Sequence, residues 1–551
     1  MPVKSCAEYD TIVVGAAYLV KGILQRLGFV SVVDEVLGSQ PVIETTYGNL
    51  AQIIIANRIT FQPVPLYHLG AWAAEHGMTH VFGIEAEWLD DDRMGALLEG
   101  LADHQVSIWS GLVGNALRYY KIAPEFLHAD TTSVYFEGQY EDEDGQPKQE
   151  SGERVPMLVE GYNKDGKRNK AQMVLSLITS GRVPLWYRPW DGNQTDDPVY
   201  LADMAALRET LLATSNTILI GDRKLCNEKT MVTFCRQKQL FIGAHPWTNT
   251  AKAVWLDTWQ ELQSGRLTWS EADYVSRNNA RKPPEKRPRY QVCEVVHELK
   301  DEKQGIGYPL RWIFTRSSDK AKRDRQRRLK ALQTGEEALR RIANLLGKYD
   351  YTSRKTIETR IEKALRQAKA QRYFTYTLGG TDEEQDWQLD WEKVPDAITQ
   401  SERFDGIATL CSNVPAERLT ASEVMTKYKA QVNVEQSIDF IKSPVQVRPM
   451  WLHSPKRLAG LLLLIMVAVL VATLLEHQVR RWIAKTGKLL KGLMPEGRDN
   501  PYPTAKAMLR AFQSYALVIV RHDKRRQFHY PKLRSVQQLI WDIMELAPLP
   551  G

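Results

Sequence analysis

A single apolar segment places the strongest constraint on how this chain can fold. Residues 458–475 read LAGLLLLIMVAVLVATLL, an uncharged run long enough to cross a lipid bilayer. Arginines stand on both sides of the run, so the flanking charges indicate no orientation across a membrane. A helix that is apolar on every face is also typical of the centre of a large domain. Because no second segment of this kind occurs in the sequence, we predict a buried central helix.

Composition bounds the class of protein. The chain of 551 residues is long enough for three or four domains, and its formal net charge of +7 permits a polyanionic partner without requiring one. Its five cysteines are scattered and have none of the paired spacings of a zinc site. An odd, dispersed set of cysteines is typical of a reducing compartment. We therefore expect a globular protein of the cytoplasm.

Two strand-forming segments each contain a prominent carboxylate. Residues 126–138 (FLHADTTSVYFEG) are rich in β-branched and aromatic side chains, and Asp130 is the acid in their interior. A charge there indicates either a strand edge open to water or a metal ligand. Residues 217–222 (TILIGD) form an apolar run that predicts a buried strand with Asp222 at its carboxyl end. The alternative for Asp222 is a structural one, a cap or an ion pair with a neighbouring basic residue.

A third carboxylate stands in the segment 428–442 (YKAQVNVEQSIDFIK). Read as one helix, this segment has four polar residues on one side: Tyr428, Gln431, Glu435 and Lys442. They align because offsets of seven and fourteen residues return almost to the starting angle. An acid between a phenol and an ammonium suits a carboxylate that holds a metal beside a phosphate backbone. An amphipathic helix with solvated charges has the same pattern, so spacing alone leaves both interpretations open.

An inserted domain is expected between the second and third acids. Asp222 and Glu435 are 213 positions apart, far more than one connection in a compact domain requires. The intervening sequence predicts a strand pair within residues 290–315 and then a long helical stretch. Trp387 and Trp391 follow, spaced to share a helix face, where they would pack in a core or stack on an extruded base.

The helical part of the insertion is strongly basic. Residues 316–372 contain 18 Lys/Arg and 7 Asp/Glu, a local net charge of +11 that exceeds the net charge of the whole chain. Such a charge would neutralise phosphates and make nucleic-acid binding strongly salt-dependent, although a solvated helix face is the alternative. The cations expected to contact DNA are Arg323, Arg325, Arg327 and Arg328.

The segment around the third acid resembles a known signature. The spacing of Tyr428, Glu435 and Lys442 is similar to that on the Glu helix of bacterial DDE-class insertion-sequence transposases, in the group called insertion-sequence family four. Gln431 stands where that signature has an arginine. The departure puts the DNA contact at this position in doubt, and it leaves the metal-binding expectation for Glu435 intact.

The other two acids lie in segments that are similar to the remaining motifs of the same family. HADTT around Asp130 resembles its first Asp motif, and GDRKLCNEKTM, which begins just before Asp222, resembles its second. The resemblance covers most of residues 1–480, with the three motifs in the family's order. That ordered combination is more specific than any one motif.

The resemblance implies an α/β fold. Its catalytic core would be RNase H-like, of the retroviral integrase superfamily, with a mixed five-stranded sheet between helices. The implied domains are a helical N-terminal DNA-binding domain (1–122), the first part of the core (123–247), an inserted domain of strands and basic helices (248–400), the second part of the core with the Glu helix and the buried apolar helix (401–485), and a C-terminal region with DNA or protein contacts (486–551).

The resemblance also implies a metal-dependent chemistry. The acids that would bind metal are Asp130, Asp222 and Glu435. Hard oxygen ligands select two Mg²⁺ or Mn²⁺ ions over zinc, and these would activate the attacking oxygen and stabilise the leaving 3′-oxygen. The DNA contacts implied on the Glu helix are Tyr428, Gln431 and Lys442. Asp439, one turn beyond Glu435, competes for its role if the helix register differs.

The implied function is cut-and-paste DNA transposition. The partners would be double-stranded DNA, as terminal inverted repeats and target, and a second copy of the chain in a synaptic homodimer. A cytoplasmic, nucleoid-associated location without membrane contact is expected. Two alternatives stay open. A catalytically inactive or domesticated DNA-binding relative should have lost one of the acids, and all three are present; a membrane-associated protein is supported only by residues 458–475.

Overall fold

The structure is a computed structural model of the chain. It describes residues 8–38, 45–136, 138–161, 170–195, 198–210, 212–280, 282–442, 452–494, 496–497, 499–522 and 525–550. Of the five cysteines, Cys6 lies outside these residues, and the four described ones are free thiols.

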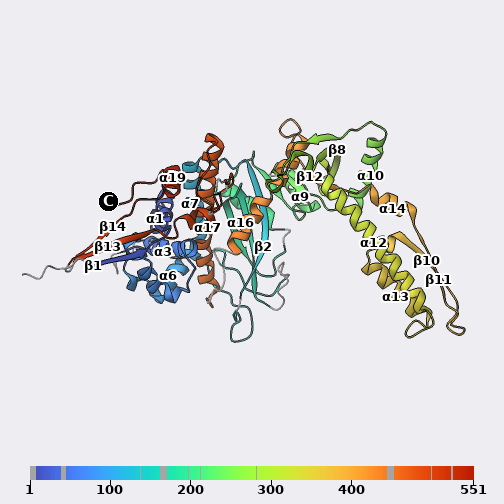
Figure 1. The fold of residues 1–551 in the computed structure, drawn as a ribbon, viewed down its shortest axis with the longest axis horizontal. Helices are drawn as coiled ribbons and strands as arrows, with labels where there is room; N and C mark the ends of the chain where they lie inside the picture. Colours follow the sequence, from blue (N-terminus) through green and yellow to red (C-terminus); the bar gives the residue numbers. More distant parts are fainter. Residues whose placement is uncertain are drawn as a thin grey trace, which may run out of the picture. The chain divides into compact units, whose positions relative to one another are not determined.

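The chain forms two compact units (Figure 1). Unit 1 comprises Met1–Phe241 together with Lys429–Gly551, and unit 2 comprises Ile242–Tyr428. The insertion is therefore longer at both ends than the predicted 248–400. One reason is that β12 (Ile407–Ser412), expected in the core, hydrogen-bonds along its length to a strand of unit 2. Likewise, the predicted N-terminal and C-terminal regions are not separate from the core, because both belong to unit 1.

The N-terminal region of unit 1 is mainly helical, as predicted. Its helices are α1 (Ala17–Arg26), α2 (Phe29–Leu37), α3 (Tyr47–Thr60), η1 (Leu66–His68), α4 (Leu69–Glu75), α5 (Met78–Phe82), η2 (Ala86–Trp88), α6 (Asp91–Asp103) and α7 (Gln105–Tyr120). One element differs from the prediction, because residues 8–13 form strand β1 (Glu8–Val13). This strand forms because it pairs over its whole length with β13 (Ala516–His522), near the other end of the chain.

The sheet of unit 1 is mixed. Its strands are β2 (Phe126–Tyr135), β3 (Gln172–Ser180), β4 (Val183–Trp190) and β5 (Ile218–Gly221), in the order β4-β3-β2-β5. β2 runs antiparallel to β3 and parallel to β5. Helices α8 (Val199–Glu209) and α9 (Glu228–Arg236) precede and follow β5, and β6 (Leu240–Ala244) contains the boundary between the units. A mixed α/β fold was the prediction, and the structure confirms it.

The apolar run forms the central helix of unit 1. It lies in α17 (Pro455–Thr486), and the 18-residue window of highest hydropathy is fully buried. Figure 1 shows α17 between the N-terminal helices and the sheet that contains β2, and α17 packs against α3, α6 and β4. A Cβ atom on Gly460 would lie 2.0 Å from the carbonyl oxygen of Leu98, so glycine is required where α17 meets α6. The predicted burial is confirmed, and among the described residues this is the one helix long and apolar enough to span a membrane.

The C-terminal region pairs with a strand of the N-terminal region. Its elements are α18 (Ala505–Ala511), β13, β14 (Arg525–His529) and α19 (Ser535–Ile543). The strand order β1-β13-β14 makes a small antiparallel sheet from both ends of the chain. The ring of His80 on α5 stacks on Phe528, and its Nε2 lies 2.9 Å from the hydroxyl of Tyr530.

Unit 2 contains a sheet and a helical arm. The sheet has the order β6-β12-β9-β8-β7, with β7 (Ser270–Ala272), β8 (Tyr290–Asp301) and β9 (Ile306–Ser317). The other elements are α10 (Asn249–Gln263), α11 (Arg277–Ala280), η3 (Pro284–Lys286), α12 (Ser318–Leu345), α13 (Arg354–Gln367), η4 (Gln371–Tyr373), β10 (Phe374–Gly379), β11 (Gln388–Lys393), α14 (Pro395–Glu402) and α15 (Ala421–Lys429). Figure 1 shows α12 and α13 side by side, next to the β10–β11 hairpin.

The two tryptophans of the insertion do not lie on a helix. Trp391 belongs to strand β11, and Trp387 directly precedes it, because this segment pairs antiparallel with β10. Trp387 is buried in a cluster with Leu339, Ile361 and Leu378. The predicted packing of Trp387 in a core is confirmed.

Candidate active site

Asp130 lies on β2, and Asp222 directly follows the neighbouring parallel strand β5. In the register of β2 and β5, Phe126 pairs with Ile218 and His128 with Ile220. Continuing this register by two residues places Asp130 opposite Asp222, just beyond the end of β5. Adjacent strands lie about 4.8 Å apart, so the backbones of the two acids are one strand spacing from each other. Sheet topology therefore brings together two acids that are far apart in the sequence.

The carboxylate of Asp222 is held by two donors on one oxygen. The hydroxyl of Tyr200 on α8 donates to Oδ1 at 2.8 Å, and the backbone amide of Lys224 donates to the same atom at 3.0 Å. Oδ2 makes no hydrogen bond with the described residues. A Cβ atom on Gly221 would lie 2.7 Å from Cδ1 of Leu225, so glycine allows the close packing of Leu225 here. The local cap predicted as an alternative is present, and it leaves one oxygen for another ligand.

Asp130 is half-buried in the middle of β2. Its Oδ1 accepts a hydrogen bond from the amide of Thr131 at 2.8 Å, which orients the carboxylate on its own strand. The strand itself is buried on both sides of this position, with Ala129 and Thr132 at 2% and 4% exposed. β2 lies between β3 and β5, so it is not an edge strand, and the role of Asp130 as a metal ligand stays a prediction.

The predicted Glu helix is interrupted in the structure. Helix α15 ends at Lys429, and a new helix, α16 (Val432–Lys442), begins after a turn at Ala430 and Gln431. Tyr428 and Glu435 therefore lie on different helices, and the alignment of four side chains along one helix face is wrong. The break accompanies a contact of Gln431, whose amide nitrogen donates to the carbonyl of Ala129 on β2 at 2.7 Å.

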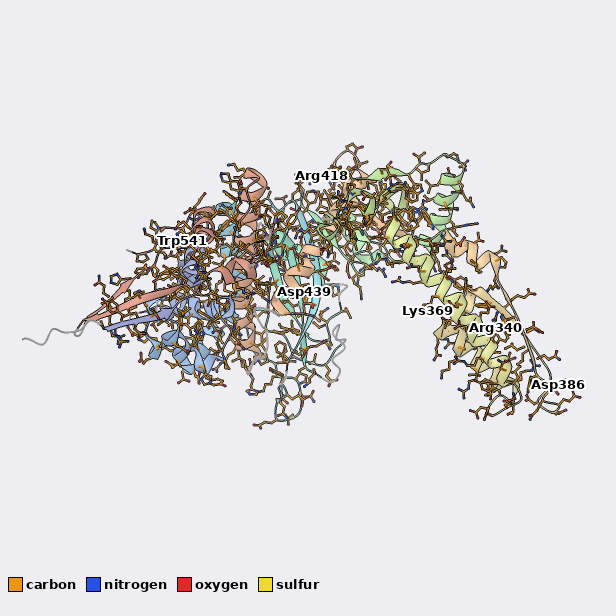
Figure 2. The ribbon with its side chains drawn as sticks, viewed as in Figure 1. Arg340, Lys369, Asp386, Arg418, Asp439 and Trp541 are labelled. Atoms are coloured by element: carbon orange, nitrogen blue, oxygen red, sulfur yellow. The ribbon has the colours of Figure 1, made fainter. Side chains whose placement is uncertain are left out.

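Glu435 lies in the first turn of α16, which packs on β2 and β3. Its side chain is exposed and makes no hydrogen bond or ion pair with the described residues. Asp439, labelled on α16 in Figure 2, is also exposed and without a described partner. Lys442 ends the helix, about 10 Å along the axis from Glu435 at 1.5 Å per residue. Both acids of α16 thus remain open to a ligand.

A buried ion pair supports the middle of α16. Arg182, in the turn between β3 and β4, is paired with Glu476 of α17, whose side chain is 2% exposed. The hydroxyl of Ser437 donates to the carbonyl of Arg182 at 3.1 Å, and the guanidinium of Arg182 donates to the carbonyl of Gln436 at 3.4 Å. The central apolar helix thereby supports the helix that carries Glu435.

The three acids form a donor set for a hard cation, although they are not gathered into one group. Among the described residues, no three His, Cys, Asp or Glu side chains are close enough to hold a metal ion. The structure thus does not gather Asp130, Asp222 and Glu435 into one metal-binding cluster. The chemistry of the set fits Mg²⁺ or Mn²⁺, because all three donors are carboxylates. The unpartnered Oδ2 of Asp222 and carboxylate of Glu435 support the same fit.

Asp203 on α8 is a further acid near Asp222 in the sequence, but it is too buried to bind a ligand from solvent. Asp203 is one turn beyond Tyr200 on α8, 1% exposed, and its Oδ1 accepts a hydrogen bond from the indole of Trp186 at 3.1 Å. Burial raises the pKa of Asp203 to about 6, against the opposing effect of hydrogen bonds from Ser176 and Trp186. We regard this carboxyl as structural.

Sequence reasoning missed the residues that support the acids. Tyr200, Arg182 and Glu476 are 22, 253 and 41 positions from the acids whose segments they support. Glu476 had one signal, since it is the first acid after the apolar run. Tyr200 and Arg182 carry no local signal, because their roles arise from contacts between distant segments.

The four arginines of α12 that were predicted to contact DNA differ in exposure. Arg323, Arg325 and Arg327 are exposed on α12. Arg328 is 6% exposed, and its guanidinium is paired with Asp405 at 2.6 Å and Glu402 at 3.1 Å. The structure therefore corrects the interpretation of Arg328, because a buried side chain bound to two acids is not available to DNA.

A basic cavity adjoins the exposed face of α12. It has a volume of about 620 Å³, and its lining has more basic than acidic residues. The lining includes Lys252, Arg327, Lys369, Trp247 and Phe404, together with the acids Asp324 and Asp405. Neither Lys252 nor Lys369 makes an ion pair with the described residues, and Figure 2 labels Lys369 beside α12. Cations without acidic partners indicate a surface for an anion.

Two comparisons bear on this arrangement. A family model described as a transposase DDE domain matches residues 124–471, more than half of the chain. A second, described as a domain of unknown function (DUF4277), matches residues 11–110. No curated protein matches the chain.

Proposed function

The chain belongs to the family of transposases with a DDE domain, and on this premise we propose that Asp130, Asp222 and Glu435 are its catalytic acids. Membership makes the protein a metal-dependent enzyme that cleaves and transfers DNA strands. The observation that supports the residue assignment is the register of β2 and β5, which, continued two residues past the His128–Ile220 pair, puts Asp130 level with Asp222. A third acid without a partner stands on the helix that packs over β2.

The finer function we propose is cut-and-paste transposition of an insertion sequence of the family-four group. The enzyme would bind the terminal inverted repeats as a synaptic homodimer and act through an RNase H-like core. Two Mg²⁺ or Mn²⁺ ions, when bound, would supply Lewis-acid activation of the attacking oxygen and stabilisation of the leaving one. The matched family domain, residues 124–471, contains all three acids and the first part of α17, which supports a single catalytic core.

The chain's own groups have distinct tasks in this proposal. Tyr200 and the amide of Lys224 fix Oδ1 of Asp222, and Oδ2 would bind the cation. The amide of Thr131 holds Asp130 in the same way. Lys442, at the end of α16, would neutralise a phosphate of the bound strand, and Tyr428 at the end of α15 would hydrogen-bond another. Gln431 is left out of the DNA contacts, because its amide is engaged with β2.

The test of the acids is DNA cleavage in vitro. With Mg²⁺ and DNA that carries the element ends, Asp130→Asn, Asp222→Asn and Glu435→Gln should each lose cleavage and keep DNA binding. Asp439→Asn is the matched control on the same helix and should cleave normally. Cleavage at the wild-type rate by any of the three variants would remove that residue from the site, and loss in Asp439→Asn alone would move the third acid to Asp439.

We further propose that the exposed face of α12 and the adjoining basic cavity contact DNA phosphates. Replacing Arg323, Arg325 and Arg327 by Gln removes three cations. At about 0.9 per phosphate contact, the slope of log K against log salt should fall by roughly 3. The matched control replaces three exposed cations elsewhere in unit 2: Arg266, Lys300 and Lys303. Equal slopes in the two triple variants would refute the assignment of this surface.

A further inference from the structure

Gln431 connects the backbones next to the first and third acids. Its side-chain nitrogen donates to the carbonyl of Ala129, which belongs to the peptide bond that joins Ala129 to Asp130. Its own carbonyl accepts the amides of Val434 at 3.1 Å and of Glu435 at 3.4 Å, the first hydrogen bonds of α16. A path of two hydrogen bonds therefore runs from the backbone of Asp130 to the backbone of Glu435.

The surroundings of Gln431 suit a neutral donor. The side chain is 7% exposed, and an unpaired cation at such a place would be costly to bury. An amide can donate to Ala129 without that cost. The residue that stands in place of the signature arginine thus acts within unit 1, in contact with the sheet.

The side-chain oxygen of Gln431 indicates that glutamine is not the most stabilising residue at this position. Its Oε1 is buried and has no hydrogen-bond partner among the described residues. A buried acceptor of this kind is destabilising, and such groups in folded proteins need an explanation. An apolar side chain of the same shape would lose one hydrogen bond and remove one unsatisfied acceptor. Stability alone therefore gives little reason for glutamine here.

The middle of α16 is fixed without Gln431. The hydroxyl of Ser437 donates to the carbonyl of Arg182, the guanidinium of Arg182 donates to the carbonyl of Gln436, and Glu476 of α17 is paired with Arg182. These contacts begin at the residue after Glu435. The N-terminal turn, which carries Glu435, is tied to β2 by Gln431.

We propose that Gln431 is a positioning residue that sets the distance between Glu435 and Asp130 for binding of the divalent cation. The proposal rests on the proposed function of the three acids. Residues that orient metal ligands affect metal affinity or activity by about 10-fold to 100-fold when they are changed. Mg²⁺ demands near-ideal octahedral geometry, so its binding is sensitive to such a displacement.

The experiment compares two identical substitutions on neighbouring turns. Gln431→Met removes the donor and keeps the length of the side chain. Gln436→Met is the matched control, because the side chain of Gln436 makes no hydrogen bond with the described residues. Each full-length variant is titrated with Mn²⁺ alone, and metal affinity is read from the rise of the melting temperature without DNA. Cleavage of element-end DNA with Mg²⁺ is measured in parallel.

The expected result separates positioning from folding. Gln431→Met should melt near the wild-type temperature without metal, bind Mn²⁺ at least about 10-fold more weakly, and cleave DNA at least about 10-fold more slowly. Gln436→Met should match the wild type in all three measurements. Wild-type metal affinity in Gln431→Met, or equal losses in both variants, would overturn the proposal.

Two further readouts keep the result interpretable. If Gln431→Met does not fold, hydrogen exchange of the wild-type protein with and without Mn²⁺ replaces it. Metal should then protect residues 126–135 and 429–437 together, and protection of one segment alone would overturn the coupling. If Asp130→Asn, Asp222→Asn and Glu435→Gln are inactive while Gln431→Met behaves as wild type, only the positioning role fails. If those acid variants cleave DNA, the proposed function itself fails.

Discussion

The buried carboxylate of Glu476 should be one of the most sensitive positions for the stability of unit 1. It is 2% exposed and makes three polar contacts: ion pairs with Arg182 and Arg480, and a hydrogen bond from the amide of Ala505 at 2.7 Å. Glu476→Gln keeps the shape and an acceptor for Ala505 but removes the charge that pairs with the largely buried guanidinium of Arg182. Breaking a buried pair in this way costs about 3–5 kcal/mol.

This free energy can be converted into a melting temperature. Unit 1 has about 360 residues, and unfolding entropy is about 2.1 cal/mol/K per residue near 60 °C, or roughly 0.8 kcal/mol/K for the unit. A loss of 3–5 kcal/mol then lowers the melting temperature by about 4–7 °C. Differential scanning calorimetry of the full chain, in which unit 1 is followed by its own transition, measures this shift.

A second ion pair on the same helix provides the control. Lys456 of α17 is paired with Asp103 at 2.8 Å, but the side chain of Asp103 is 41% exposed. Asp103→Asn should cost no more than about 1 kcal/mol, because exposed pairs are screened by water. A shift of less than 1 °C for Glu476→Gln, or equal shifts for the two variants, would refute the reasoning from burial.

Three further predictions follow from single contacts in unit 1. Asp203→Asn should stabilise the protein by up to about 3 kcal/mol at pH 7.5, because burial raises the pKa of Asp203 from 3.8 to about 6 and makes its charged form costly. Denaturant titrations should show the stability difference between the variant and the wild type shrinking as the pH falls from about 6 towards about 4. A difference that does not change with pH would contradict this reasoning. Gly460→Ala should lower stability by at least about 2 kcal/mol, since its Cβ would lie 2.0 Å from Leu98; an unchanged melting temperature would count against this packing. Tyr200→Phe should slow cleavage about 10-fold by freeing Asp222 to rotate, with little change in stability, and a wild-type rate would remove Tyr200 from the site.

Local features of the fold could be predicted because neighbouring residues decide them. Asp90 caps α6 by accepting the amide of Arg93 at 2.9 Å, and Asn227 caps α9 in the same way. Both were recognisable as short polar side chains ahead of an apolar periodic run. The strands that hold the first two acids were likewise set by their β-branched and apolar residues.

Contacts between distant segments could not be predicted in the same way. β1 forms as a strand because β13, about 500 positions later, supplies its hydrogen-bond partners. Arg327 and Arg328 are adjacent residues of the same type, yet Arg328 is buried against Asp405 and Arg327 is exposed. In each case the sequence allowed two states, and a partner that is remote along the chain selected one.

The segment of the third acid shows the same division. Its residues favour a continuous helix from Tyr428 to Lys442, and no glycine or proline marks a break. The helix breaks at Gln431, where the side chain is bound to the carbonyl before Asp130. The sequence by itself determined the three acids, their order and the buried central helix, because these depend on residue type and periodicity. Tertiary structure decided the pairing of Asp130 with Asp222 and the position of Glu435, because strand register and helix packing depend on contacts that no local pattern specifies.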